Sequence, residues 1–189
     1  MGLEGIWEAM TLPNVITVAR LAAVPVFAWA FLQGSMQAAF LVFLAAGISD
    51  GIDGFLARRW KQETAFGAWL DPVADKLLMA SAYGLSGYLG FLPAWLVLLV
   101  IGRDVLIVGA VLLSRAIGKP LEARPILVSK ANTVAQVLLV VLVLADRAFG
   151  IAAGEVIAAM VLATATLTIV SGAAFFSIWM RLMREVTAP

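Results

Sequence analysis

The sequence predicts an all-α membrane protein in which six membrane-spanning helices form one bundle. Hydrophobic residues make up 63% of the 189 residues, whereas soluble domains average about 45–50%. The mean hydropathy is +1.02, and apolar stretches long enough to cross a bilayer core of about 30 Å recur along the chain. Because the connections are short, we expect a single membrane domain over residues 1–189.

Each expected span is an apolar stretch bounded by polar or turn-forming residues. The second ends on acidic residues, the third begins on them, and the fifth opens on a polar run. The spans are residues 14–33, 37–56, 71–90, 93–114, 129–147 and 153–180. Residues 3–11, with Trp7 between two glutamates, are compatible with a short interfacial helix or with a disordered terminus. The lack of a basic residue there argues against a cleaved secretory signal.

The composition excludes several kinds of chemistry. The chain has no cysteine and no histidine, so disulfides, thiol catalysis, histidine bases and the usual zinc ligands are excluded. Lys and Arg (13) nearly balance Asp and Glu (12), and no nucleic-acid partner is expected. Any catalysis must therefore depend on carboxylates, basic side chains and hydroxyls.

The basic residues gather in alternate connections, which predicts the orientation by the positive-inside rule. They follow spans 2, 4 and 6, whereas the opposite connections carry only Arg147. The sequence therefore predicts both termini and the active site on the cytoplasmic side, in a bacterial inner membrane. The residues concerned are Arg58, Arg59 and Lys61; Arg115, Lys119, Arg124 and Lys130; and Arg181 and Arg184.

Four of the six aspartates lie within residues 50–75. Asp50 and Asp53 are three residues apart at the end of span 2, and Asp71 and Asp75 are four apart at the start of span 3. Each pair projects from one helix face, and a short connection brings the pairs together. Such a cluster needs cations. Its oxygen ligands suit Mg²⁺ or Mn²⁺, and four carboxylates are enough for two ions.

A purely structural interpretation of the acids is also open. Asp71 before Pro72 is a typical helix N-cap followed by a first-turn proline, and nearby basic residues can neutralise carboxylates. We favour the functional interpretation because ionisable groups at membrane depth are costly. Gly51, Gly54 and Gly67, with Ala57 and Arg58, outline a slot in which a pyrophosphate would fit.

The spacing D-x2-D-G-x2-A-R-x8-G-x3-D-x3-D resembles the signature of the CDP-alcohol phosphotransferase family, with all eight positions filled. The likeness implies two metal ions held by Asp50, Asp53, Asp71 and Asp75, with Asp75 as the general base; the alternative role of Asp75 is that of a ligand alone. It also implies CDP-diacylglycerol as donor and a homodimer among membrane lipids. The implied CDP-binding residues are Asp50, Gly54, Ala57, Arg58, Gly67 and Asp71.

The acceptor is expected to carry a phosphate. Basic residues outside the aspartate motif are candidates to bind it: Arg20, Arg103, Arg115, Arg124 and Lys130. Arg103-Asp104 and the run Ser-Lys-x-Asn-Thr-x2-Gln from residue 129 resemble eukaryote-type cardiolipin synthases, which favours phosphatidylglycerol as acceptor. Glycerol 3-phosphate, as in phosphatidylglycerophosphate synthases, is the alternative. For Arg103-Asp104, an ordinary intramembrane ion pair is a second interpretation.

A divalent cation transporter is the remaining alternative from another class. Transporters place aspartates in helices near the bilayer midplane and contain inverted repeats. Here the acids crowd one membrane face and no repeat is evident, so the enzyme is the preferred interpretation.

Overall fold

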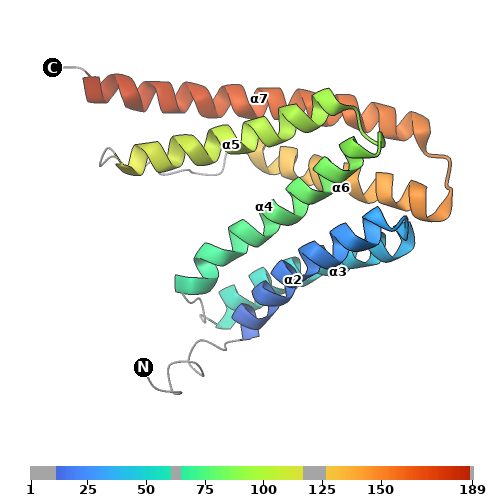
Figure 1. Cartoon of the computed structure of the whole chain (residues 1–189). Helices are drawn as coiled ribbons and strands as arrows, with labels where there is room; N and C mark the ends of the chain where they lie inside the picture. Colours follow the sequence, from blue (N-terminus) through green and yellow to red (C-terminus); the bar gives the residue numbers. More distant parts are fainter. Residues whose placement is uncertain (1–11, 61–64, 117–126, 188–189) are drawn as a thin grey trace. The chain divides into compact units, whose positions relative to one another are not determined.

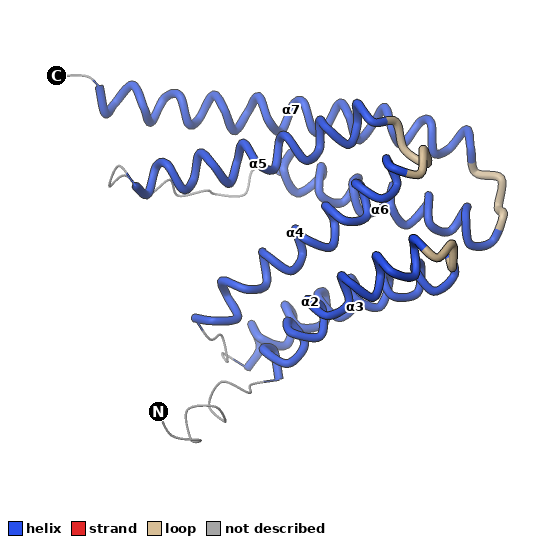
Figure 2. Tube along the Cα trace, in the orientation of Figure 1, coloured by secondary structure: helices blue, strands red, loops and turns tan. Residues whose placement is uncertain are grey.

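A computed structural model of the chain describes residues 12–60, 65–116 and 127–187, with side chains for 18–49, 73–116, 127–181 and 183. The described ranges contain helices and short loops and no strand (Figures 1 and 2). With the labels of Figure 1, the helices are α2 (Leu12–Leu32), α3 (Met36–Trp60), α4 (Ala65–Tyr88), α5 (Ala94–Ala116), α6 (Leu127–Phe149) and α7 (Gly154–Thr187). The predicted all-α class with six helices is confirmed, and the suggested helix over residues 3–11 lies outside the described residues.

Length and composition agree with a polytopic membrane protein. In the described part of the chain, α5, α6 and the stretch Gly154–Arg181 of α7 are long and apolar enough to cross a membrane. Two shorter apolar stretches, Val18–Leu32 and Met36–Ser49, lie in α2 and α3. Large apolar side chains such as Trp29 and Leu98 are exposed, as expected of surfaces that face lipid.

Three helices extend at least four residues beyond one expected limit. Helix α3 continues to residue 60, α4 begins at residue 65 and α7 continues to residue 187, whereas the expected limits were 56, 71 and 180. Hydropathy marks the part of a helix that lies in the bilayer, and the backbone stays helical where polar side chains follow. The longer α3 and α4 place the aspartates inside helices.

The chain forms two compact units. Unit 1 comprises residues up to Ser86 together with Val143–Ala152, which means α2, α3, most of α4 and the end of α6. Helix α2 packs against α3, and the Phe27 ring lies 5.6 Å from that of Phe31 and 5.8 Å from that of Phe43. This aromatic contact fixes the two helices against each other.

A glycine turn reverses the chain between α2 and α3. Gly34 has a φ of 74°, which L-residues with a side chain rarely adopt. The Ser35 N–H donates to the Ala30 carbonyl at 2.9 Å and the Gly34 N–H to the Phe31 carbonyl at 3.1 Å. These are the two bonds of a Schellman motif, and the helices therefore run antiparallel from this turn.

Unit 2 comprises Gly87–Leu142 and the chain from Ala153 onward. It holds α5, most of α6 and α7, and α5 packs along α7 (Figure 1). Most of its buried polar side chains lie on α6 and α7.

Candidate functional site

The backbone of α3 places positions 50 and 53 in register with a stripe of buried residues earlier in the helix. Ala39, Phe43 and Ala46 are buried and recur every three or four residues, so they form one stripe of the helix. At about 100° per residue, positions 50 and 53 extend that stripe within about 60° of its centre. By helix periodicity alone, positions 50 and 53 share the face of α3 that carries these described buried residues.

The acidic positions of α4 also follow its buried face. Ala74 and Leu78 are buried, and Gly67 and Asp71 lie on the same stripe, because helical positions separated by three, four or seven residues share a face. Asp75 lies next to the stripe and is half-buried. That each acidic pair projects from one helix face stays a prediction, because the structure describes side chains for Asp75 alone among the four.

The two pairs also match in depth along their helices. Asp50 lies ten residues before the end of α3, and Asp75 lies ten residues after the start of α4. Asp53 and Asp71 lie seven and six residues from the same ends, or about 10 Å. The four-residue connection keeps the helix ends within about 18 Å. If α3 and α4 run antiparallel, these equal distances put Asp50 level with Asp75, and Asp53 level with Asp71.

Asp71 is not the N-cap of α4. The helix begins at Ala65, so both Asp71 and Pro72 lie within it and the capping interpretation is wrong. Proline has no N–H, and the carbonyl of Ala68 therefore receives no helix hydrogen bond from residue 72. This leaves a backbone acceptor three residues before Asp71, on the same side of α4 as the acidic stripe.

The acidic faces fit a divalent cation by their donor chemistry. Carboxylates on the interior faces of membrane helices are costly without compensating positive charge, and oxygen donors are the ligands that hard cations prefer. For most residues of the motif the structure describes the helix backbone alone: Asp50, Asp53, Gly54, Ala57, Arg58, Gly67 and Asp71.

Arg103 is the centre of a polar cluster in unit 2. Its Nη1 donates to Oδ1 of Asp104 at 2.8 Å. Its Nη2 donates to Oγ of Ser129 at 2.7 Å and to Oγ of Ser171 at 2.6 Å. The Arg103 side chain is only 9% exposed, and it packs beside Gly172, where a Cβ would make an ordinary contact at 3.6 Å from Cγ of Arg103. The expected ion pair is present, and α5, α6 and α7 all contribute to the cluster.

A second polar contact lies one turn further along α6 and α7. Thr168 donates its hydroxyl to Oδ1 of Asn132 at 2.8 Å, and both side chains are buried. Asn132 is three residues after Ser129, and Thr168 is three residues before Ser171. The two contacts are therefore successive levels of one antiparallel polar seam.

Two hydrogen-bond donors of the seam have no partner among the described residues. They are Nε of Arg103 and Nδ2 of Asn132, and both are buried. Buried N–H groups are normally paired. A group rich in acceptor oxygens, such as a phosphate, would satisfy them.

The other predicted acceptor-binding residues are spread over the chain. Arg20 is buried on α2 in unit 1. Counted from the turn at Gly34, it is level with residue 48 of α3, within one turn of Asp50. Arg115 and Lys130 are exposed in unit 2, and Arg124 lies outside the described residues.

Thr168 and Ser171 were not identified from the sequence. Small hydroxyl residues are common in membrane helices, where they assist helix packing. The signal that could have found them is the spacing of Thr164, Thr168 and Ser171, which places all three on one face of an otherwise apolar helix.

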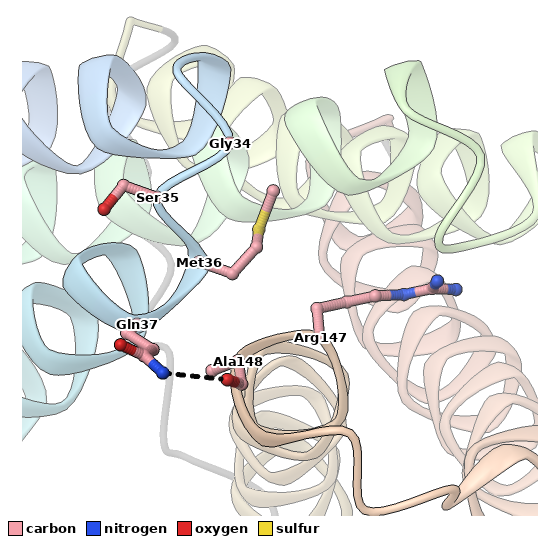
Figure 3. Close-up of a pocket in the computed structure, with 6 residues that line it drawn as sticks. All are labelled: Gly34, Ser35, Met36, Gln37, Arg147 and Ala148. Carbon is pink, nitrogen blue, oxygen red and sulfur yellow. Dashed lines mark hydrogen bonds between the residues drawn. The ribbon is translucent and has the colours of Figure 1, made fainter.

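A pocket in unit 1 lies away from the acids. It is lined by Gly34, Ser35, Met36, Gln37, Arg147 and Ala148. Nε2 of Gln37 donates to the Ala148 carbonyl at 3.3 Å, and the Arg147 side chain points away from Gln37 (Figure 3). Gln37 is 13 residues before Asp50 on α3, or about 20 Å. This pocket is therefore distinct from the aspartate region.

Comparisons with known proteins agree with the motif. Residues 10–183 match the family model described as CDP-alcohol phosphatidyltransferase. A Streptomyces coelicolor protein named cardiolipin synthase (CMP-forming) is 39% identical over 60% of this chain and 55% of its own. A probable cardiolipin synthase of Drosophila melanogaster is 37% identical over 66% of this chain and 44% of its own.

A third relative carries a different name. The Pectobacterium atrosepticum CDP-diacylglycerol–glycerol-3-phosphate 3-phosphatidyltransferase is 37% identical over 67% of this chain and 72% of its own. The chain spans about half the length of the cardiolipin synthases that it matches.

Proposed function

The chain belongs to the CDP-alcohol phosphatidyltransferase family, and from that premise we propose that it makes cardiolipin from CDP-diacylglycerol and phosphatidylglycerol. The acceptor hydroxyl oxygen forms a bond to the phosphatidyl phosphorus, the pyrophosphate P–O bond breaks, and CMP leaves. What supports the proposal is the match to the family model, together with the spacing of the two acidic pairs at similar distances from the connected ends of α3 and α4.

In this proposal, Asp50, Asp53, Asp71 and Asp75 hold two ions of Mg²⁺ or Mn²⁺. The family is generally dependent on divalent metal. When bound, the metal would neutralise the pyrophosphate and the charge that develops on CMP. Gly54, Ala57, Arg58 and Gly67, with Asp50 and Asp71, bind the CDP group.

Asp75 is proposed to accept the proton of the acceptor hydroxyl. The chain has no histidine, so a carboxylate is the natural base. The half-buried position of Asp75 beside the buried stripe of α4 supports this role.

The charge of the Arg103 cluster supports phosphatidylglycerol as the acceptor. Asp104 balances Arg103 at 2.8 Å, and Asn132 in the next level is neutral. A phosphodiester carries one negative charge, whereas the monoester of glycerol 3-phosphate carries up to two. A cluster with balanced charge suits the singly charged phosphodiester of phosphatidylglycerol better than the doubly charged monoester of glycerol 3-phosphate. Glycerol 3-phosphate remains the second candidate because of the relative from Pectobacterium.

The remaining parts of the proposal concern the setting of the enzyme. The basic residues that follow spans 2, 4 and 6 support a cytoplasmic active site and cytoplasmic termini. We also propose one domain over residues 1–189 and a homodimer. Light scattering of the purified protein with its detergent mass subtracted would measure the subunit number, and a monomer would contradict the dimer.

The decisive experiment supplies purified protein with CDP-diacylglycerol, Mg²⁺ or Mn²⁺, and one acceptor at a time. Thin-layer chromatography of labelled lipid identifies the product, and released CMP is measured in parallel. Cardiolipin is expected with phosphatidylglycerol. If phosphatidylglycerophosphate forms and cardiolipin does not, the acceptor is glycerol 3-phosphate, and the proposed phosphatidyl transfer with release of CMP still holds. Ion flux in proteoliposomes without CMP release would favour the transporter instead.

A further inference from the structure

Helix α7 supplies one hydroxyl to each level of the polar seam. Ser171 accepts from Nη2 of Arg103 at 2.6 Å, and Thr168 donates to Oδ1 of Asn132 at 2.8 Å. Both hydroxyls are buried. The two side chains that they contact come from different helices, α5 and α6, so α7 sets the orientation of both.

These contacts leave donors unused. Thr168 occupies the oxygen of the Asn132 amide, and the Nδ2 group keeps its N–H bonds without a partner among the described residues. Asp104, Ser129 and Ser171 take three N–H bonds of Arg103, while Nε has no partner in the described part of the chain. Hydroxyls from α7 thus fix the side chains and leave N–H groups for an acceptor-rich ligand.

We infer that Thr168 and Ser171 are positioning residues for the acceptor: they hold Asn132 and Arg103 so that the remaining N–H groups of both bind its phosphate. This inference rests on the proposed function. The alternative is that both hydroxyls only join helices, as polar residues in membrane proteins often do. Simple helix joining would change stability and would not act selectively on the acceptor.

The test compares variants of Thr168 in mixed micelles that contain CDP-diacylglycerol and a varied mole fraction of dioleoyl phosphatidylglycerol. Thr168→Val keeps the shape and removes the hydroxyl, and should raise the acceptor KM about tenfold, the effect of one lost hydrogen bond. The KM for CDP-diacylglycerol and kcat should change less than about twofold. Thr168→Ser retains the hydroxyl and should restore the wild-type acceptor KM.

Two other hydroxyls of α7 serve as matched controls. Thr166 and Ser177 are exposed and donate to carbonyls of their own helix, at 2.9 and 2.8 Å. Thr166→Val and Ser177→Ala should therefore leave the acceptor KM unchanged. Ser171→Ala should raise the acceptor KM as Thr168→Val does. If Thr168→Val does not fold, Ser171→Ala provides the test.

A double variant tests whether Thr168 acts through Asn132. Adding Thr168→Val to Asn132→Ala should raise the acceptor KM no further, because the contact is already lost. An unchanged acceptor KM in Thr168→Val and Ser171→Ala, or an equal rise in the CDP-diacylglycerol KM, would overturn the inference while leaving the proposed function intact. A wild-type protein that releases no CMP would instead refute the proposed function.

Discussion

Replacing Gly87 with alanine should destabilise the junction between α4 and α5. A Cβ at Gly87 would lie 2.8 Å from Cγ2 of Val97, well inside ordinary van der Waals contact. Val97 is buried and β-branched, so it cannot easily turn away. Overpacking costs about 1–3 kcal/mol, while alanine in place of glycine in a helix gains about 0.5–1 kcal/mol.

The net loss is therefore about 1 kcal/mol, which lowers Tm by about 2–4 °C in a chain of this size. Thermal unfolding of the purified protein in detergent measures this change in Tm. Gly84→Ala is the control on the same helix, because a Cβ at Gly84 would meet nothing within 4 Å. That variant should be slightly more stable than the wild type.

A second substitution separates the clash from other effects. In the double variant Gly87→Ala with Val97→Ala, the offending methyl group is gone, so the loss should be smaller than the sum of the two single losses. Equal Tm values for Gly87→Ala and Gly84→Ala would refute the reasoning, because both would then behave as unhindered helix positions.

Three further predictions concern catalysis. Asp50→Asn, Asp53→Asn and Asp71→Asn should each nearly abolish CMP release while the protein still inserts and purifies normally, and EDTA should do the same reversibly; full activity without metal would contradict this. Asp75→Asn should reduce turnover far more than CDP-diacylglycerol binding, and equal losses would argue against a base. Lys130→Ala should raise the acceptor KM about tenfold, measured with phosphatidylglycerol, and an unchanged KM would remove Lys130 from the acceptor site.

The helices could be predicted from the sequence because a bilayer demands long apolar stretches. Their ends could not, since the helical backbone of α4 begins at Ala65, before the apolar stretch and before the proline that suggested a start at Asp71. For the aspartates, spacings of three and four residues predict which positions share a helix face, and this part of the site stays a prediction.

The partners of Arg103 were less predictable. Asp104 is its sequence neighbour and was identified as a candidate partner. Ser171 is 68 residues away, and its contact depends on how α7 packs against α5. Spacing within one helix carries no information about that register, so the hydroxyls of α7 emerge only from the structure.

The pairing of Arg103 with Asp104 also has a consequence for how the chain enters the membrane. A lone arginine in the middle of α5 would oppose transfer of the helix into lipid. Its counter-ion belongs to the same helix, so the charge of α5 is balanced without any side chain from α6 or α7. Insertion of α5 therefore does not have to wait for α7.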